Sequence, residues 1–208
     1  TLSLSGALSH TADITIDVAE NKTLTYSGTA INVGANTITL SGGGSLVSGG
    51  MTLNDAQSKL LLNSITLDSA STSANSLGLD VDANSTVTAF SVGHITPVSI
   101  AENEMLSGGI TITAGSIKLD EIGTLGSSVT MSGGTLEVDN NLTLSGNLTQ
   151  SGNIAIAVAE NKTLGYSGAV VNLGAYTLTM SGKGTFGNTN ALVLNNASSK
   201  LLLSNTAT

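Results

Sequence analysis

The chain has 208 residues, a formal net charge of −8, 25 glycines, one proline and no cysteine or tryptophan. The missing cysteines exclude disulfides and thiolate metal sites. With only six basic residues, the chain lacks the clustered Lys and Arg that nucleic-acid binding requires. No apolar run approaches the ~18 residues that a transmembrane helix needs. The apolar content of 40% is too high for a wholly disordered chain.

The chain repeats itself at an offset of 140 residues. Residues 14–28 (ITIDVAENKTLTYSG) return as 154–168 (IAIAVAENKTLGYSG), and residues 31–42 return as 171–182. Residues 54–62 return one position late, as 195–203. Segment 1–68 therefore matches 141–208, as expected for a tandem module of about 140 residues. We predict one continuous unit over 1–208, because each coil of a solenoid contacts only its neighbours.

A finer period lies within this module. The triplet Ala-Glu-Asn occurs at 19–21, 101–103 and 159–161, with spacings close to multiples of ~20 residues, the length of one solenoid coil. Short segments of alternating apolar and polar residues, bounded by Gly, Ser and Asn, fill the intervals and predict strands. No segment has a sustained helical period. The expected fold is all-β, a three-sided parallel β-helix of about ten coils.

One corner of each coil is expected to carry a residue that accepts a left-handed backbone, which Asn and Gly do at little cost. Stacked Asn side chains could also hydrogen-bond along the axis. This predicted corner ladder consists of Asn21, Gly42, Asn63, Asn84, Asn103, Asn140, Asn161 and Gly182. Residues 68–76 (DSASTSANS) lack large apolar residues and are predicted to form a loop bulging from one coil.

Recurrent phrases such as TLSLSG (1–6), TITLSG (37–42) and NLTLSGNLTQSGN (141–153) give the chain a resemblance to bacterial surface β-helix proteins. The similar types are the passenger regions of autotransporters and filamentous adhesins. The resemblance implies a right-handed β-helix exported to the bacterial cell surface. It also implies a non-enzymatic role as part of an extracellular fibre, filament or adhesin stalk.

Acidic residues recur near the predicted corner and could form a column along one edge. Because like charges one coil apart repel, a hard cation such as Ca²⁺ could bind there. The residues of this predicted calcium edge are Asp82, Glu102, Asp120 and Asp139. The alternative is a solvated acidic edge, since no established calcium-loop motif occurs. No other cofactor is expected.

A carbohydrate-binding or carbohydrate-cleaving β-helix is the alternative function. Glycoside cleavage needs two acids facing each other across a groove, and sugar binding usually needs aromatic or basic side chains, which are scarce here. Tyr26 and Tyr166 occupy equivalent apolar positions and are predicted to pack inside. His10 and His94 have no partners at metal-ligand spacing and are predicted to face solvent.

The expected partners are further copies of the repeat, in the same long chain or in neighbouring subunits stacked end to end. Exposed terminal coils favour such contacts. Host or surface glycans are a further expected class of partner. Nucleic acid and a membrane span are not expected.

Overall fold

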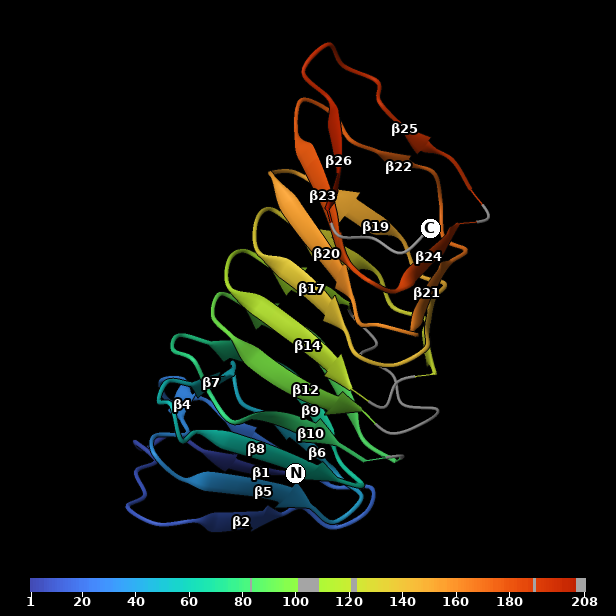
Figure 1. Ribbon diagram of the computed structural model, residues 1–208. Helices are drawn as coiled ribbons and strands as arrows, with labels where there is room; N and C mark the ends of the chain where they lie inside the picture. Colours follow the sequence, from blue (N-terminus) through green and yellow to red (C-terminus); the bar gives the residue numbers. More distant parts are fainter. Residues whose placement is uncertain (83, 101–108, 121–122, 189, 205–208) are drawn as a thin grey trace.

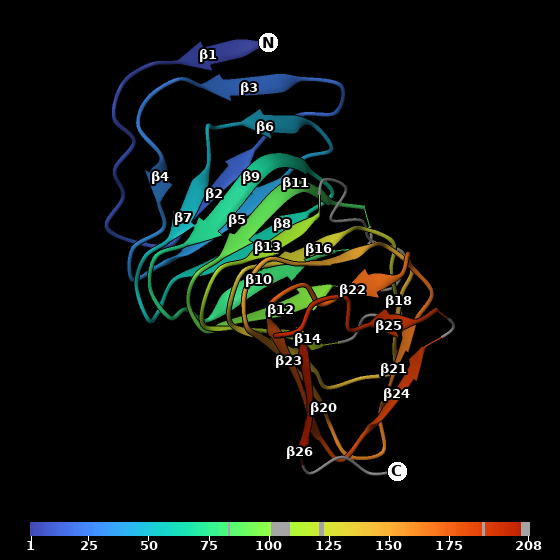
Figure 2. The same ribbon diagram turned by 90° about the horizontal axis from the view of Figure 1, so that it is seen from above.

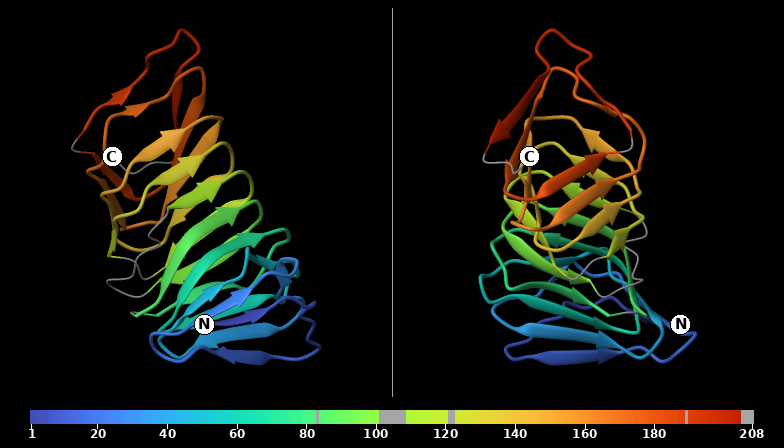
Figure 3. Two further views of the ribbon diagram at one scale, coloured as in Figure 1. Left: turned by 180° about the vertical axis from the view of Figure 1, so that it is seen from behind. Right: turned by 45° about the vertical axis from the view of Figure 1, so that its right-hand side comes forward.

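The protein is a β-solenoid of about nine coils, with parallel strands stacked in chain order from the N-terminal to the C-terminal end (Figure 1). The computed structural model describes residues 1–82, 84–100, 109–120, 123–188 and 190–204. Within these ranges there is no helix. The all-β parallel solenoid predicted from the sequence is confirmed, with about nine coils in place of the expected ten. Both views in Figure 3 show the coils lying one above another.

One sheet runs the length of the molecule, and we call it the long sheet. Neighbouring strands in it are parallel and belong to successive coils. Its strands, in order, are β2 (Ile14–Asp17), β5 (Thr37–Ser41), β8 (Lys59–Asn63), β10 (Gly78–Val81), β12 (Thr96–Ile100), β14 (Ser116–Asp120), β17 (Thr135–Val138), β20 (Ile154–Val158), β23 (Thr177–Gly182) and β26 (Lys200–Ser204).

A second sheet, which we call the branched sheet, also has ten strands, because two short strands lie off its main path. The main path is β1 (Leu2–Leu4), β3 (Thr23–Tyr26), β6 (Ser45–Val47), β9 (Thr66–Thr72), β11 (Thr86–Val92), β13 (Ile110–Ile112), β16 (Val129–Met131) and β19 (Leu148–Gln150). The off-path strands are β4 (Ile31–Asn32) and β7 (Met51–Leu53).

Two smaller sheets complete the C-terminal half. One has four strands, β15 (Thr124–Leu125), β18 (Leu142–Leu144), β21 (Thr163–Tyr166) and β24 (Thr185–Asn188). The other pairs β22 (Val171–Asn172) with β25 (Leu192–Val193). Seen from above, the strands of successive coils follow one another from one end of the molecule to the other (Figure 2). Right-handed winding and three distinct faces stay predictions.

The core is a column of aliphatic side chains that stack from coil to coil. In β8, for example, Leu60 and Leu62 are buried while Leu61 between them is not. The strand register places equivalent inward residues directly over one another, and all are at most 1% exposed: Ile38, Leu60, Leu79, Val98 and Leu119. Burying a side chain of this size stabilises the fold by ~1.5–3 kcal/mol.

The loop predicted over 68–76 is wrong for its first half. Residues Thr66–Thr72 form β9, which pairs with β6 and β7 on one side and with β11 on the other. Within it, Ala70 is buried and lies between Met51 and Phe90 in the stack. The strand forms because backbone groups of the two adjacent coils are ready to pair with it, although its own side chains are small.

The sequence repeat is also a repeat of structure. The strands β2 to β8 in the first copy have counterparts β20 to β26 in the second, at the offsets of 140 and 141 residues seen in the sequence. Hydrogen bonds recur with them. Gly34 N donates to Asn54 Oδ1 at 2.8 Å, and its counterpart Gly174 N donates to Asn195 Oδ1 at 2.9 Å. Some inter-coil contacts thus recur in both copies.

Tyr26 and Tyr166 are buried, as predicted from the sequence. The hydroxyl of Tyr166 donates to Ala169 O at 2.6 Å and accepts the backbone N–H of Leu148 from the preceding coil at 3.2 Å. In the first copy, the hydroxyl of Tyr26 accepts from Leu8 N at 3.0 Å. A Cβ on Gly168 would clash with the Tyr166 ring, which explains the glycine two residues after each tyrosine.

We expect the Tyr166→Phe variant to lower the free energy of unfolding by ~1–3 kcal/mol, because it leaves a buried backbone N–H at Leu148 without its acceptor. Chemical denaturation of the purified chain measures this loss. The matched control is Tyr176→Phe, since the Tyr176 side chain is 37% exposed. Equal losses in the two variants would contradict a structural role for the buried hydroxyl.

Candidate functional site

A reverse turn forms a corner of the solenoid after strand β2 in the first copy and after strand β20 in the second. In the first copy, Lys22 N donates to Ala19 O at 3.0 Å and Asn21 has φ of 60°. In the second copy, Lys162 N donates to Ala159 O at 3.1 Å and Asn161 has φ of 62°. Both asparagines therefore adopt the left-handed backbone that the sequence predicted for them.

The other residues of the predicted corner ladder do not all share this conformation. Gly42 and Gly182 have φ of 106° and 92°. Asn63 ends β8, and the positive φ falls on the next residue, Ser64, at 56°. Asn140 is not among the residues with positive φ.

The ladder residues also do not all occupy equivalent positions in the register of the long sheet. Asn63 pairs with Ser41 and not with Gly42. Asn84 is exposed, and Asn103 lies outside the described residues. The Ala-Glu-Asn triplet at 159–161 directly follows β20, and the triplet at 19–21 follows β2 after one residue, Val18. β2 and β20 are strands of the same sheet, while 101–103 lie outside the described ranges.

Side-chain oxygens tie neighbouring coils together at other positions. Asp13 Oδ1 accepts Thr37 N at 2.7 Å, and its counterpart Asn153 Oδ1 accepts Thr177 N at 2.9 Å. Similar bonds run from Thr163 N to Asn141, from Ala169 N to Asn147 and from Ile95 N to Asn75. In the part of the chain described, no hydrogen bond joins two side chains of the predicted ladder. For the tie at Asp13 and Asn153, the sequence signal was an Asx residue at the same place in both copies.

The carboxylate of Asp82, a residue of the predicted calcium edge, accepts hydrogen bonds from three donors. It accepts the backbone N–H of Ser64 at 2.9 Å, that of Asn84 at 3.2 Å and the hydroxyl of Ser85 at 2.5 Å. Partial burial acts to raise the pKa of this carboxyl, and the hydrogen bonds from the three donors outweigh it. The pKa of Asp82 therefore lies below the usual value for aspartate.

Two acids in or next to strands of the long sheet, Asp80 and Asp139, are paired with lysines. Asp139, part of the predicted calcium edge, forms an ion pair of 2.7 Å with Lys118 from the preceding coil. Lys59 and Asp80 form the same diagonal pair at 2.7 Å. These ion pairs are about 40% exposed, so each contributes only ~0–1 kcal/mol. They neutralise charge between stacked coils.

Calcium binding at the predicted edge stays a prediction. Asp82 and Asp139 both follow strands of the long sheet, and Asp120 is the last residue of β14. Glu102 lies outside the described residues. Over the ranges that the structure describes, no group of three or more His, Cys, Asp or Glu side chains gathers to hold a metal ion.

The repeat indicates that two carboxylates, those of Asp13 and Asp55, serve as hydrogen-bond acceptors. Asp55 Oδ1 accepts Gln57 N at 2.9 Å, and its counterpart Asn196 Oδ1 accepts Ser198 N at the same distance. Asp13 is likewise replaced by Asn153 with its bond intact. Asp and Asn share an oxygen acceptor but only Asp carries charge or a titratable proton. Neither position therefore needs the chemistry of an acid.

The two histidines differ from each other. His94 is exposed, as predicted. The prediction is wrong for His10, which is half-buried, with Nδ1 3.1 Å from Ala12 O and Nε2 3.2 Å from Asn32 O. His10 lies close to Asn32 because residues 5–13 pass beside the following coil. No local sequence pattern predicts this contact.

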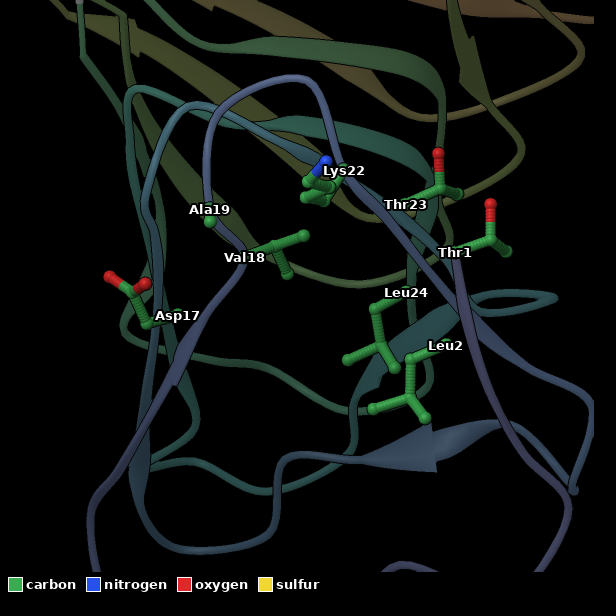
Figure 4. A pocket seen from close by; sticks show the side chains of 8 residues that line it. All are labelled: Thr1, Leu2, Asp17, Val18, Ala19, Lys22, Thr23 and Leu24. Atoms are coloured by element: carbon green, nitrogen blue, oxygen red, sulfur yellow. The ribbon is translucent and has the colours of Figure 1, made fainter.

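Two shallow pockets lie on the described surface, each of about 310 Å³. The first opens at the first coil, where Leu2 and Leu24 from paired strands lie side by side and Val18 faces the same space (Figure 4). The second is a groove on the outer side of β9 and β11, lined by small residues including Ser69, Ala89 and Ser91. Neither lining presents two acids, and the only aromatic residue of the groove, Phe90, is buried.

No protein-family model, no curated protein and no solved structure matches this chain. Across the described ranges, none of the secondary structure is a helix that could cross a lipid bilayer.

We expect Asn161→Val to lower the free energy of unfolding by ~1–3 kcal/mol, because a β-branched residue is strained at a φ of 62°. Asn161→Gly is the matched control and should cost far less, since glycine adopts this conformation freely. Urea denaturation measures both. Equal stability of the two variants would remove the argument from backbone conformation.

We expect Asp82→Asn to lower the free energy of unfolding by ~1 kcal/mol at neutral pH, through weaker hydrogen bonds. Because the folded-state pKa is depressed, Asp82 stabilises the fold above its unfolded-state pKa of ~3.9, and this contribution is lost as the pH falls through the folded-state value. Denaturation of both proteins from pH 7 downwards should show the difference disappearing in that acid range. Ser85→Ala removes one donor and should produce a smaller loss. A difference that persists at the acid end would contradict this assignment.

Proposed function

We propose that the chain is a non-enzymatic structural segment of an extracellular surface fibre, filament or adhesin stalk, wound as a right-handed, three-sided β-helix. The observation that carries this proposal is the structural repeat, in which strands and inter-coil hydrogen bonds recur at an offset of 140 residues within one continuous stack. Repetition extends length without adding new chemistry, which is the requirement for a stalk or fibre.

The direction of the backbone hydrogen bonds gives the rod its resistance to deformation. In the long sheet, these bonds run between coils and hence along the stacking axis, from β2 through to β26. Stretching or bending the rod strains many of them together, and the stacked aliphatic core resists the same motions. The Asx ties and the lysine–carboxylate pairs add further links between adjacent coils.

The outer surface supports a structural role more than a catalytic one. The long sheet presents residues such as Thr39 and Thr179 between its buried positions. Acids at two repeat positions are exchanged for asparagine, so charge is not preserved there. The proposed location at the bacterial cell surface rests on the resemblance, in composition and in recurrent short segments, to autotransporter passengers and filamentous adhesins.

The two ends of the stack suggest the partner. Exposed leucines gather in the first and last coils, with Leu2 at 61% and Leu203 at 65% exposure. Strands β1, β2 and β26 also lie at the edges of their sheets. A further coil, from the same long chain or from a neighbouring subunit, would cover these leucines, fill the pocket in Figure 4 and continue the parallel pairing.

Electron microscopy of native material tests the proposed function directly. Thin filaments or stalks of uniform width on the cell surface are the expected result. Compact single particles inside the cell, or turnover of a carbohydrate substrate by the purified chain, would overturn it.

A double variant tests the end-to-end contact. Leu2→Lys with Leu4→Lys should weaken concentration-dependent self-association at least roughly tenfold, because each buried leucine contributes ~1.5–3 kcal/mol and the edge gains charge. Sedimentation velocity measures the effect. The control, Leu77→Lys with Ile95→Lys, changes two comparably exposed residues in the middle of the stack. Equal weakening in both, or no association of the unmodified chain, would contradict this contact.

A further inference from the structure

Both polar contacts that the described residues make with the His10 side chain come from hydrogen-bond acceptors. Its Nδ1 lies 3.1 Å from the carbonyl oxygen of Ala12, and its Nε2 lies 3.2 Å from that of Asn32 in the following coil. Carbonyl oxygens only accept hydrogen bonds, and neutral imidazole has a single N–H. The neutral ring therefore satisfies one contact and sets a lone pair against a lone pair at the other. The imidazolium donates to both.

In the second copy of the repeat, a different residue donates to two backbone carbonyl oxygens. Gln150 occupies the position equivalent to His10, and its Nε2 donates to Gly152 O at 2.9 Å and to Thr177 O at 3.1 Å. Gly152 is the counterpart of Ala12. Thr177 belongs to the following coil and is the counterpart of Thr37, so Gln150 reaches that coil at a different residue from the Asn32 that His10 contacts. The amide NH₂ carries two N–H groups at every pH, so glutamine makes both contacts without changing its charge.

The contacts on either side show that the two positions are equivalent. On one side, the tyrosine hydroxyl accepts from Leu8 N in the first copy and from Leu148 N in the second. On the other side, Asp13 and Asn153 accept the backbone N–H of Thr37 and Thr177. Between these contacts the segments differ in the residue that ties them to the next coil.

We propose that His10 is a proton-dependent tie, which fastens segment 5–13 to the following coil when the ring is protonated and loosens it when the ring is neutral. Histidine is the side chain that ordinarily changes charge between pH 5 and 8. The tie is therefore strongest at mildly acidic pH and weakens as the pH rises.

The surrounding charges allow this assignment. Asp13 is the only other titratable residue in segment 5–13, and its carboxylate accepts from Thr37 N. Residues 27–36 of the following coil, which contain β4, include no titratable side chain. The next strand along, β7, has none either. A change with pH in this region is thus traced to His10 or Asp13, and histidine is the residue type of the two that ordinarily changes charge between pH 5 and 8.

Hydrogen exchange at the Leu8 amide, measured by NMR on the complete 208-residue chain, tests the proposal. After correction for the intrinsic pH dependence of exchange, we expect protection to be roughly 2- to 10-fold greater at about pH 5 than at about pH 8, the effect of one hydrogen bond. In His10→Gln, which copies the second repeat, protection should be the same at both values. The Leu148 amide, tied by Gln150, serves as an internal reference that does not respond.

The matched control is His94→Gln, which changes the exposed histidine and should keep the pH dependence of the Leu8 amide. Unchanged protection of Leu8 in the unmodified chain between the two pH values would overturn the proposal. A pH dependence that survives in His10→Gln, or disappears in His94→Gln, would also overturn it.

Discussion

The hydrogen bond between the backbones of successive coils is the interaction on which the structure depends. Each strand of the long sheet pairs in parallel with the strand one coil before and one coil after it. Such pairing requires coils of nearly equal length, so that the inward-facing residues of one coil stack on those of the next. The column from Ile38 through Leu60 and Leu79 follows from that condition. Core packing, corner turns and surface ties all adjust to it.

At the corners, side chains provide hydrogen-bond acceptors for backbone N–H groups that have no partner in a strand. A chain that turns sharply leaves backbone N–H groups without strand partners, and these groups need acceptors. Asp13, Asn54 and Asn153 supply them with side-chain oxygens. Left-handed residues such as Asn21 and Asn161 close the tightest turns. A solenoid can therefore carry many Asx and Gly residues for structural reasons alone, which lowers the value of any single acid as evidence for catalysis.

The internal repeat allows equivalent positions to be compared within one chain. Positions that keep their residue, such as Tyr26 and Tyr166 with the glycine two residues later, are fixed by close packing around the ring. Positions that change, such as His10 and Gln150, reveal which chemical property a contact needs. At the acid positions, the shared property is an oxygen acceptor. This comparison favours a structural role, and it singles out His10 and Gln150 as a pair in which a side chain that can gain a proton is exchanged for one that cannot.

The sequence alone determined the all-β solenoid, the alternation of buried residues, the interior tyrosines and the left-handed turns at Asn21 and Asn161. These features are local, since a period of two and a glycine or asparagine at a turn are visible in a few residues. Only the tertiary structure decided that residues 68–72 form a strand and that Pro97 lies inside one. It also decided that His10 meets Ala12 and Asn32. Those outcomes depend on the neighbouring coil about 20 residues away, whose backbone supplies partners that no local pattern encodes.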